Sequence, residues 1–326
     1  MVEIKNKSLE GYSFIDLFAG IGGFHYALGS FGSKCVYASE WDKPAAYTYF
    51  VNHHILPDGD ITKVSENNIP SHDILCAGFP CQAFSISGNQ KGFDDTRGTL
   101  FFDVARIAKY HKPKVLFLEN VKNLLKHDNG KTFRIIHDTL RELGYAVYYK
   151  VINSGDFGVP QHRERIYIVA FRNDLSKKDN FQFPEIQIKT SLYSILEDNP
   201  TRAKIIERDD IKVYKKPLAK TSPQPNRPLQ IGIVNKGGQG ERIYDPMGHS
   251  ITLSAYGGGA GAKTGLYLID NVVRKLSPRE CARLQGFEDN FVLSNNDMQS
   301  YKQFGNGVTI NVLQYILYGI SEILKI

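Results

Sequence analysis

The sequence predicts an α/β fold, in which a doubly wound, mostly parallel sheet forms a large domain that is joined to a second, smaller domain. Through residues 13–171, short apolar runs typical of buried strands alternate with stretches of helical spacing. Beyond about residue 191 this alternation fades, and proline and glycine become frequent. With 326 residues the chain is about twice the usual domain size. We therefore expect one domain from residues 1–193 plus 278–326 and another from residues 194–277.

The composition is that of an ordinary soluble globular protein, with 42% hydrophobic and 23% charged residues. No apolar run approaches the ~20 residues that span a membrane, and residues 1–7 lack the apolar segment of a secretory signal. The four cysteines, at positions 35, 76, 81 and 281, include no Cys-x-x-Cys pair. This spacing argues against a structural zinc site and a disulfide framework. We expect a cytoplasmic protein with no metal site and no membrane partner.

The first predicted strand, turn and helix are typical of a nucleotide site. Residues 13–18 form an apolar run, residues 19–23 (Ala-Gly-Ile-Gly-Gly) follow at once, and residues 24–31 can continue as a helix. Glycines in such a turn let a nucleotide approach the backbone at the start of the helix. The spacing differs from the Gly-x-Gly-x-x-Gly of dinucleotide sites, so the match to that motif is weak.

Acidic and aromatic residues follow the next predicted strand, at residues 35–39. Glu40 is placed to accept hydrogen bonds from a ribose, and Trp41, the only tryptophan, could stack on an adenine or pack in the core. A further acid, Asp60, lies in the turn at residues 59–61. Together these residues predict an adenosine-containing cofactor.

A cysteine follows the predicted strand at residues 73–76. Gly78 permits close approach of a ligand, and Pro80 fixes one backbone angle just before Cys81. Because ligands bind at the carboxyl edge of such sheets, Cys81 is a candidate nucleophile. The alternative is an inert thiol, because buried cysteine usually packs as a small hydrophobe. Residues 87–98 are polar and glycine-rich, as in loops that close over a substrate.

The remaining elements complete the large domain. We expect helices at residues 100–110 and 132–143 and strands at residues 113–118, 145–151 and 165–171. Glu119 directly follows one of these strands, so it lies at the same sheet edge as Cys81. An apolar helix at residues 310–324 is long enough to pack back on the sheet.

The predicted small domain has features of a nucleic-acid-binding surface. Residues 201–230 hold eight Lys or Arg against three Asp or Glu, a local balance of +5 that suits a polyanion. Glycine-dense segments at residues 236–242 and 254–259 carry Gln, Arg and Tyr side chains that could reach base edges in DNA. The alternative is a set of flexible surface loops. Residues 274–286, which end at a glycine, are expected to form a polar helix.

Six motifs in order give the chain a resemblance to the C5-cytosine DNA methyltransferases, most closely to the bacterial HhaI-type enzymes. They lie at residues 16–23, 78–82, 119–121, 161–165, 274–287 and 305–308. The resemblance covers nearly the whole chain and implies a Rossmann-like fold that binds S-adenosylmethionine, with a DNA-recognition domain. Gly307 is a departure, since the family usually has Ser or Ala there, but it removes no catalytic group.

The resemblance also implies the chemistry. The thiolate of Cys81 would add to C6 of a cytosine, C5 would take a methyl group, and loss of the C5 proton would expel the cysteine. Glu119 would hold N3 and the exocyclic amine, Arg165 would hold O2, and Arg163 is a supporting candidate. Glu119 and Arg165 could also form an ion pair with each other. A free thiol has a pKa near ~8.5, so Cys81 needs positive charge or a proton acceptor nearby.

Two larger sets of residues follow from the same resemblance. The expected cofactor contacts are Phe18, Gly20, Gly22, Gly23, Glu40, Trp41, Asp60, Ile61, Gly78, Pro80, Leu100, Asn306 and Val308. The expected DNA contacts are Gln82, Ser85, Ser87, Gln239, Arg242, Thr252, Tyr256 and Gly257.

The DNA substrate would be double-stranded, and the target base would rotate out of the helix. Ser87 and Gln239 match residues that approach the vacated space, and Arg242 is the leading reader of a guanine. Similarity of the glycine-rich loops to those of HhaI-type enzymes supports 5′-GCGC-3′ as the target, with the inner cytosine methylated. We expect a monomer on DNA, with a cognate restriction endonuclease, if present, acting separately.

Three other functions remain open at this point. An RNA cytosine-5 methyltransferase of the same family would be separated by comparing tRNA with duplex DNA as substrate. A nicotinamide- or flavin-dependent oxidoreductase would explain the glycine turn and Glu40, but not Cys81, Glu119 and Arg165 together. A catalytically inactive DNA-binding protein would not require that catalytic set.

Overall fold

The computed structural model describes residues 9–80, 100–219, 222 and 224–325. The chain divides into two compact units. The six-stranded unit comprises Val2–Ile152, Glu164–Pro184 and Leu313–Ile326. The five-stranded unit comprises Asn153–Arg163 and Glu185–Val312. The expected functional division, with residues 194–277 as the recognition domain, stays a prediction.

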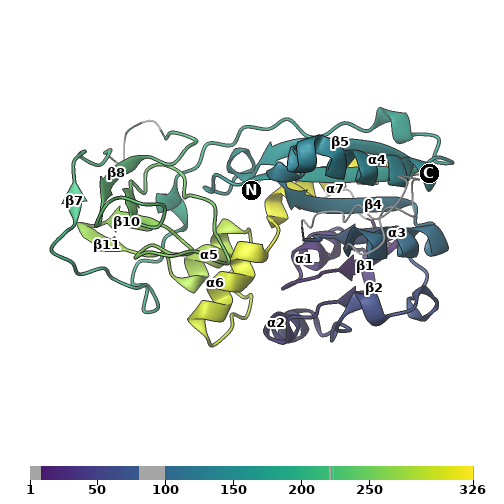
Figure 1. Cartoon of the computed structure of the whole chain (residues 1–326), viewed down its shortest axis with the longest axis horizontal. Helices are drawn as coiled ribbons and strands as arrows, with labels where there is room; N and C mark the ends of the chain where they lie inside the picture. The colour runs from purple at the N-terminus through teal and green to yellow at the C-terminus, as the bar shows by residue number, and fades with distance from the viewer. Residues whose placement is uncertain (1–8, 81–99, 220–221, 223, 326) are drawn as a thin grey trace. The chain divides into compact units, whose positions relative to one another are not determined.

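The six-stranded unit contains the predicted doubly wound, mostly parallel sheet (Figure 1). Its strands are β1 (Ser13–Leu17), β2 (Lys34–Ser39), β3 (Ile74–Ala77), β4 (Val115–Val121), β5 (Tyr145–Asn153) and β6 (Glu164–Arg172). The strand order is β2-β1-β3-β4-β6-β5. The pairs β1–β2, β1–β3 and β3–β4 are parallel, and β4–β6 is antiparallel. The chain direction across the sheet reverses between β1 and β3, and such a switch point is where these sheets bind ligands.

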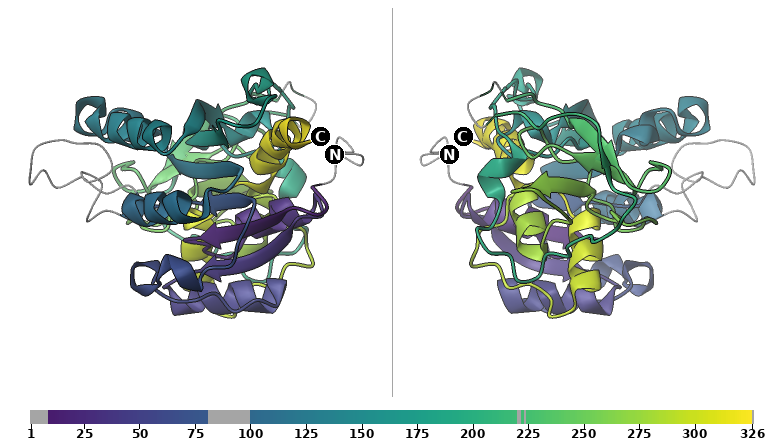
Figure 2. Two further views of the ribbon diagram at one scale, coloured as in Figure 1. Left: turned by 90° about the vertical axis from the view of Figure 1, so that its right-hand side faces the viewer. Right: turned by 90° about the vertical axis from the view of Figure 1, so that its left-hand side faces the viewer.

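Helices cover both faces of this sheet, and Figure 2 shows α3 and α4 on one side and α7 on the other. They are α1 (Gly23–Gly29), α2 (Lys43–His53), α3 (Leu100–His111), α4 (Lys131–Glu142) and α7 (Ile310–Leu324). Apolar residues at helical spacing on α3, including Phe101, Val104 and Ala105, pack with Leu75 and Leu116 of the sheet. On the opposite face the ring of Phe24 meets that of Phe117 edge-on, with centroids 5.1 Å apart.

The five-stranded unit contains a second sheet that the sequence did not predict. Its strands are β7 (Lys212–Val213), β8 (Gln230–Ile233), β9 (Arg242–Tyr244), β10 (Leu266–Ile269) and β11 (Val272–Arg274). The strand order is β11-β10-β9-β8-β7. Ile231, Ile243 and Leu266 are among the residues that form its small core.

Two helices follow this second sheet, α5 (Pro278–Leu284) and α6 (Asp297–Asn306). The expected helix at residues 274–286 was wrong at its start, because Arg274 ends β11. The helix begins after Ser277, whose side chain accepts a hydrogen bond from the backbone N–H of Glu280 while the Glu280 side chain bonds back. This capping box fixes the true start.

One stretch of the described residues, Asp297–Leu324, is apolar and long enough to cross a membrane. It comprises α6, α7 and the residues that join them, and most of its apolar part is buried inside the protein. Leu313, Ile316 and Leu317 of α7 have no exposed surface. A buried core helix of a globular protein can have the same length and apolar composition, so this stretch is weak evidence for a membrane span.

Candidate active site

The turn between β1 and α1 forms an open cradle of backbone. Phe18, Gly20 and Gly22 all have positive φ, at 54°, 56° and 86°, a conformation that is uncommon outside glycine. A Cβ on Gly22 would overlap the ring of His53, whereas one on Gly20 would meet nothing within 4 Å. The backbone at Gly20 is therefore accessible, which fits the predicted approach of a nucleotide.

Glu40, at the end of β2, holds this turn. Its Oε2 accepts a hydrogen bond from Gly20 N at 2.8 Å, and its Oε1 accepts one from Asp42 N at 2.7 Å. A carboxylate oxygen can accept more than one hydrogen bond, so this role is compatible with the predicted contact to a ribose.

The other described cofactor candidates of the six-stranded unit differ in their surroundings. Trp41 is 71% exposed, which rules out core packing and leaves its indole face available for stacking. The Asp60 carboxylate accepts hydrogen bonds from Thr62 N and Thr62 Oγ1, at 3.1 Å and 2.7 Å. The hydroxyl bond is the main cause of the lowered pKa of Asp60. The Ile61 side chain belongs to the core, so only its backbone can reach a ligand.

The segment that leads to the candidate nucleophile is fixed at the same sheet edge. Phe79 O accepts a hydrogen bond from Nδ2 of Asn120, which is 2% exposed, at 2.8 Å. Asn120 belongs to the motif at residues 119–121, but no role for it was predicted from the sequence. β3 and β4 are parallel neighbours with Ala77 opposite Leu118, so Phe79 and Asn120, two positions further along each chain segment, lie close together.

Cys81 lies outside the described residues, as do Gln82, Ser85 and Ser87. Their predicted roles therefore stay predictions.

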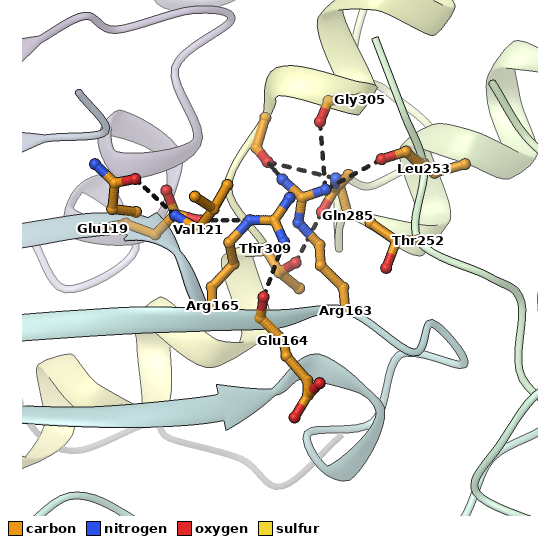
Figure 3. Close-up of polar contacts among 12 residues, drawn as sticks. Glu119, Val121, Arg163, Glu164, Arg165, Thr252, Leu253, Gln285, Gly305 and Thr309 are labelled. Carbon is orange, nitrogen blue, oxygen red and sulfur yellow. Dashed lines mark hydrogen bonds and ion pairs between the residues drawn. The ribbon is translucent and has the colours of Figure 1, made fainter. Parts of the chain in front are cut away.

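Glu119 and Arg165 meet as an ion pair, as the sequence allowed. Arg165 Nε lies 3.2 Å from Glu119 Oε1, and the two side chains are 15% and 9% exposed (Figure 3). The antiparallel register sets Glu119 opposite Tyr167, which makes Arg165 its diagonal neighbour. Arg165 also donates from Nη1 to the carbonyl oxygen of Glu164. The pair offers a carboxylate and a cation at one edge of the sheet.

Arg163 bonds backbone groups of the five-stranded unit instead of a carboxylate. Its guanidinium donates to three backbone carbonyl oxygens, those of Leu253, Gly305 and Gly307, at 3.3, 3.3 and 2.6 Å. The residue is 3% exposed. This geometry fits the supporting role suggested for Arg163 better than direct contact with a substrate.

The two glycine-rich segments of the five-stranded unit lie against each other. Gly261 N donates to Gly240 O at 2.7 Å, and a Cβ on Gly240 would overlap the backbone of Gly258. Gln239 and Arg242 are exposed on one segment. Tyr256, on the other, is 74% exposed, and Gly257 beside it is also exposed. Gln239, Arg242 and Tyr256 are therefore exposed on two segments that touch each other.

Three further candidates lie in the connection between β9 and β10 or at the end of α6. Thr252 donates from Oγ1 to His162 O at 2.6 Å, so its hydroxyl already has a backbone partner. Asn306 ends α6 and is exposed, whereas Val308 is 8% exposed. These two belong to the five-stranded unit, while the other described cofactor candidates belong to the six-stranded unit.

The chain is similar to known proteins over nearly its whole length. Residues 12–322 match the family described as C-5 cytosine-specific DNA methylase. The chain is 55% identical over 327 residues to the type II methyltransferase M.HhaI of Haemophilus parahaemolyticus, covering 100% of this chain and 99% of that protein. It is 44% identical over 308 residues to the type II methyltransferase M.SsoII of Shigella sonnei, covering 94% and 79%.

A solved structure shows the same fold at low sequence identity. The Dnmt2 methyltransferase of S. pombe aligns with a TM-score of 0.70 and 23% identity, covering 97% of this chain and 100% of that chain. This agreement confirms the predicted Rossmann-like α/β fold.

Proposed function

Because the chain belongs to the C-5 cytosine-specific DNA methylase family, we propose that it flips a cytosine out of duplex DNA and methylates C5 with Cys81 as covalent nucleophile. Its activity as a DNA (cytosine-5)-methyltransferase, of the type found in type II restriction–modification systems, follows from the family. The single observation that supports these steps best is the Glu119–Arg165 pair. It lies at the sheet edge to which Asn120 fixes the segment before Cys81.

The proposed steps assign each side chain one task. The thiolate of Cys81 bonds to C6, and the electrons displaced from the C5–C6 double bond make C5 nucleophilic. Glu119, when protonated, donates to N3 and accepts from the exocyclic amine, while Arg165 donates to O2 and offsets the developing negative charge. After C5 is methylated, the C5 proton passes to solvent and its bonding electrons restore the C5–C6 double bond. The C6–sulfur bond breaks at the same time, and its electrons leave on the Cys81 thiolate.

The methyl donor is S-adenosylmethionine, which when bound supplies the methyl group as an electrophile. The open backbone at Gly20, the carboxylate of Glu40 and the exposed indole of Trp41 fit its adenosine portion. The remaining proposed contacts are those named from the sequence: Phe18, Gly22, Gly23, Asp60, Ile61, Gly78, Pro80, Leu100, Asn306 and Val308.

The DNA target that we propose is 5′-GCGC-3′, on the basis of the two glycine-rich loops. Gln239, Arg242 and Tyr256 are exposed there, as readers of DNA must be. The protein would act as a cytoplasmic monomer on DNA, separately from any cognate endonuclease.

We expect Gln239→Ala to weaken the complex with flipped DNA while leaving cofactor affinity unchanged. Gln239 is exposed and would occupy the space that the base vacates, so only the DNA complex loses a contact. Binding titrations with each ligand would measure both affinities. Equal losses for DNA and for S-adenosylmethionine would contradict this role.

Bisulfite sequencing of plasmid DNA from cells that express the protein tests the proposed function. Methylation of the inner cytosine at GCGC sites, and at no other cytosines, is the expected result. Methylation at another sequence would overturn the target but keep the enzyme. Methylation of tRNA in preference to duplex DNA would instead support the RNA alternative.

A further inference from the structure

Arg163 joins two segments that contact different ligands in the proposed function. The Nη1 atom of Arg163 donates both to Leu253 O and to Gly305 O, and its Nη2 atom donates to Gly307 O (Figure 3). Leu253 follows Thr252, a proposed DNA contact. Gly305 and Gly307 lie on either side of a proposed cofactor contact at position 306.

The backbone N–H and the carbonyl of Leu253 are both held by side chains of residues 161–163. Its N–H donates to Gln161 Oε1 at 3.1 Å, while its carbonyl accepts from Arg163. Gln161 also donates from Nε2 to Leu284 O at 3.0 Å and has no exposed surface. Because both bonds are buried, the position of Leu253 is fixed relative to Arg163.

The end of α6 rests directly on the same DNA-contacting segment. A Cβ on Gly305 would overlap the backbone of Ser254 and Ala255. No side chain separates the two backbones, so a displacement of one must move the other. Beyond the helix, Thr309 donates to Gln285 Oε1 at 2.8 Å, which anchors the linker to α7.

We propose that Arg163 is a positioning residue that couples the DNA-contacting segment 252–257 to the cofactor-contacting segment 306–308. This inference rests on the proposed function, because that function assigns the two segments to DNA and to S-adenosylmethionine. Satisfying the free carbonyls at the end of α6 would be a structural role. The additional bond to Leu253 O is what links that helix end to the DNA-contacting segment.

A guanidinium suits this task for a geometric reason. Its planar fork presents several N–H groups in fixed directions, so that one side chain can serve three carbonyls at once. A lysine ammonium keeps the charge but is a compact point on a flexible stem. Arg163→Lys is therefore expected to hold one segment at a time and to lose the coupling.

The test measures S-adenosylmethionine affinity of the full chain with and without a GCGC duplex. The ratio of the two dissociation constants is the coupling factor, and such factors are typically about 5–150. We expect a factor in this range for the unmodified chain and a factor within about two-fold of one for Arg163→Lys. We also expect raised KM values for both substrates, with a smaller change in kcat.

Arg165→Lys is the matched control, because it makes the same change two residues away in a side chain that bonds Glu119 instead. Its kcat should fall while its coupling factor stays that of the unmodified chain. An unaltered coupling factor in Arg163→Lys, or no coupling in the unmodified chain, would overturn the inference. If the unmodified chain neither binds nor methylates duplex DNA, the proposed function fails first, and the inference fails with it.

Amide hydrogen exchange gives a readout that needs no variant. In the unmodified chain, DNA added without cofactor should slow exchange at the backbone N–H groups of residues 308–310. Exchange there that is insensitive to DNA would also overturn the inference, even if Arg163→Lys did not fold.

Discussion

Arg163 and Arg165 are two positions apart in the chain, yet their partners differ in kind. Arg165 lies against a carboxylate, that of Glu119, and keeps 15% of its side chain exposed. Arg163 lies among three backbone carbonyl oxygens and is 3% exposed. A cation paired with a carboxylate can exchange or share that partner with a polar substrate. A cation bonded to backbone carbonyls holds backbone in place. We therefore propose that the same residue type serves chemistry at position 165 and geometry at position 163.

The largest effect should come from the carboxylate of the Arg165 pair. We expect Glu119→Gln to lower kcat by about 10²–10⁴-fold, because the amide keeps the shape but cannot pass a proton to N3. Single-turnover kinetics with a GCGC duplex would measure it. Glu119→Asp serves as the control that retains a carboxyl group. A Glu119→Gln enzyme with unchanged kcat would remove the acid role from this residue.

Arg165→Lys should have the next largest effect. Loss of a donor aimed at developing charge costs about 10²–10³-fold in kcat, and a lysine cannot reproduce the guanidinium fork that meets Glu119 and O2. Arg163→Lys, measured in parallel at saturating substrates, should show the smaller loss in kcat. A larger loss in kcat for Arg163→Lys than for Arg165→Lys would contradict the proposal that Arg165 takes part in the chemistry and Arg163 positions backbone.

A third arginine, Arg242, has one weak hydrogen bond to the part of the chain that the structure describes. Arg242 is exposed and donates from Nε to Gly237 O at a long 3.4 Å. If Arg242 reads a guanine as proposed, we expect Arg242→Ala to lower discrimination for that base by about 1–3 kcal/mol, with little change in kcat at the preferred site. Methylation rates on duplexes with single substitutions would show the change.

Arg208→Ala is the matched control for that variant, since its guanidinium is exposed and already paired with Asp210. Equal loss of discrimination in both variants would indicate a general charge effect instead of base reading.

The smallest effect concerns a buried group that must stay neutral. Burial lowers the pKa of His249 from 6.5 to about 4. Between these two pH values the unfolded chain binds a proton that the folded chain does not, so this histidine makes stability fall as pH falls from 6.5 towards 4. We expect His249→Gln to reduce the drop in Tm between pH 7 and pH 5 by a few degrees. An unchanged pH dependence would contradict the neutral buried state.

Most of the six-stranded unit was predictable from sequence. Its strands are short apolar runs that end in polar or glycine-rich turns, and Glu40 directly follows β2 as expected. Glu119 was expected to follow its strand but lies inside β4, which continues to Val121. The Glu119–Arg165 ion pair was one of the two arrangements that the sequence allowed, beside direct contact with the base.

The five-stranded unit was harder to predict for a physical reason. Its strands are two to four residues long, too short for an alternating pattern to emerge. The partners of Arg163 were not foreseen because they are backbone carbonyls from distant segments, which leave no trace in side-chain spacing. The same holds for the bond from Asn120 to Phe79 O.

Covalent trapping shows directly whether Cys81 is the nucleophile. The protein would be incubated with S-adenosylmethionine and GCGC duplexes that carry 5-fluorocytosine at the inner position, where fluorine blocks proton loss and prevents release of the enzyme. We expect a complex trapped through Cys81 for the unmodified chain, slower trapping for Arg165→Lys, and none for Cys81→Ser. Equal trapping of the Cys81→Ser variant would contradict the proposed mechanism.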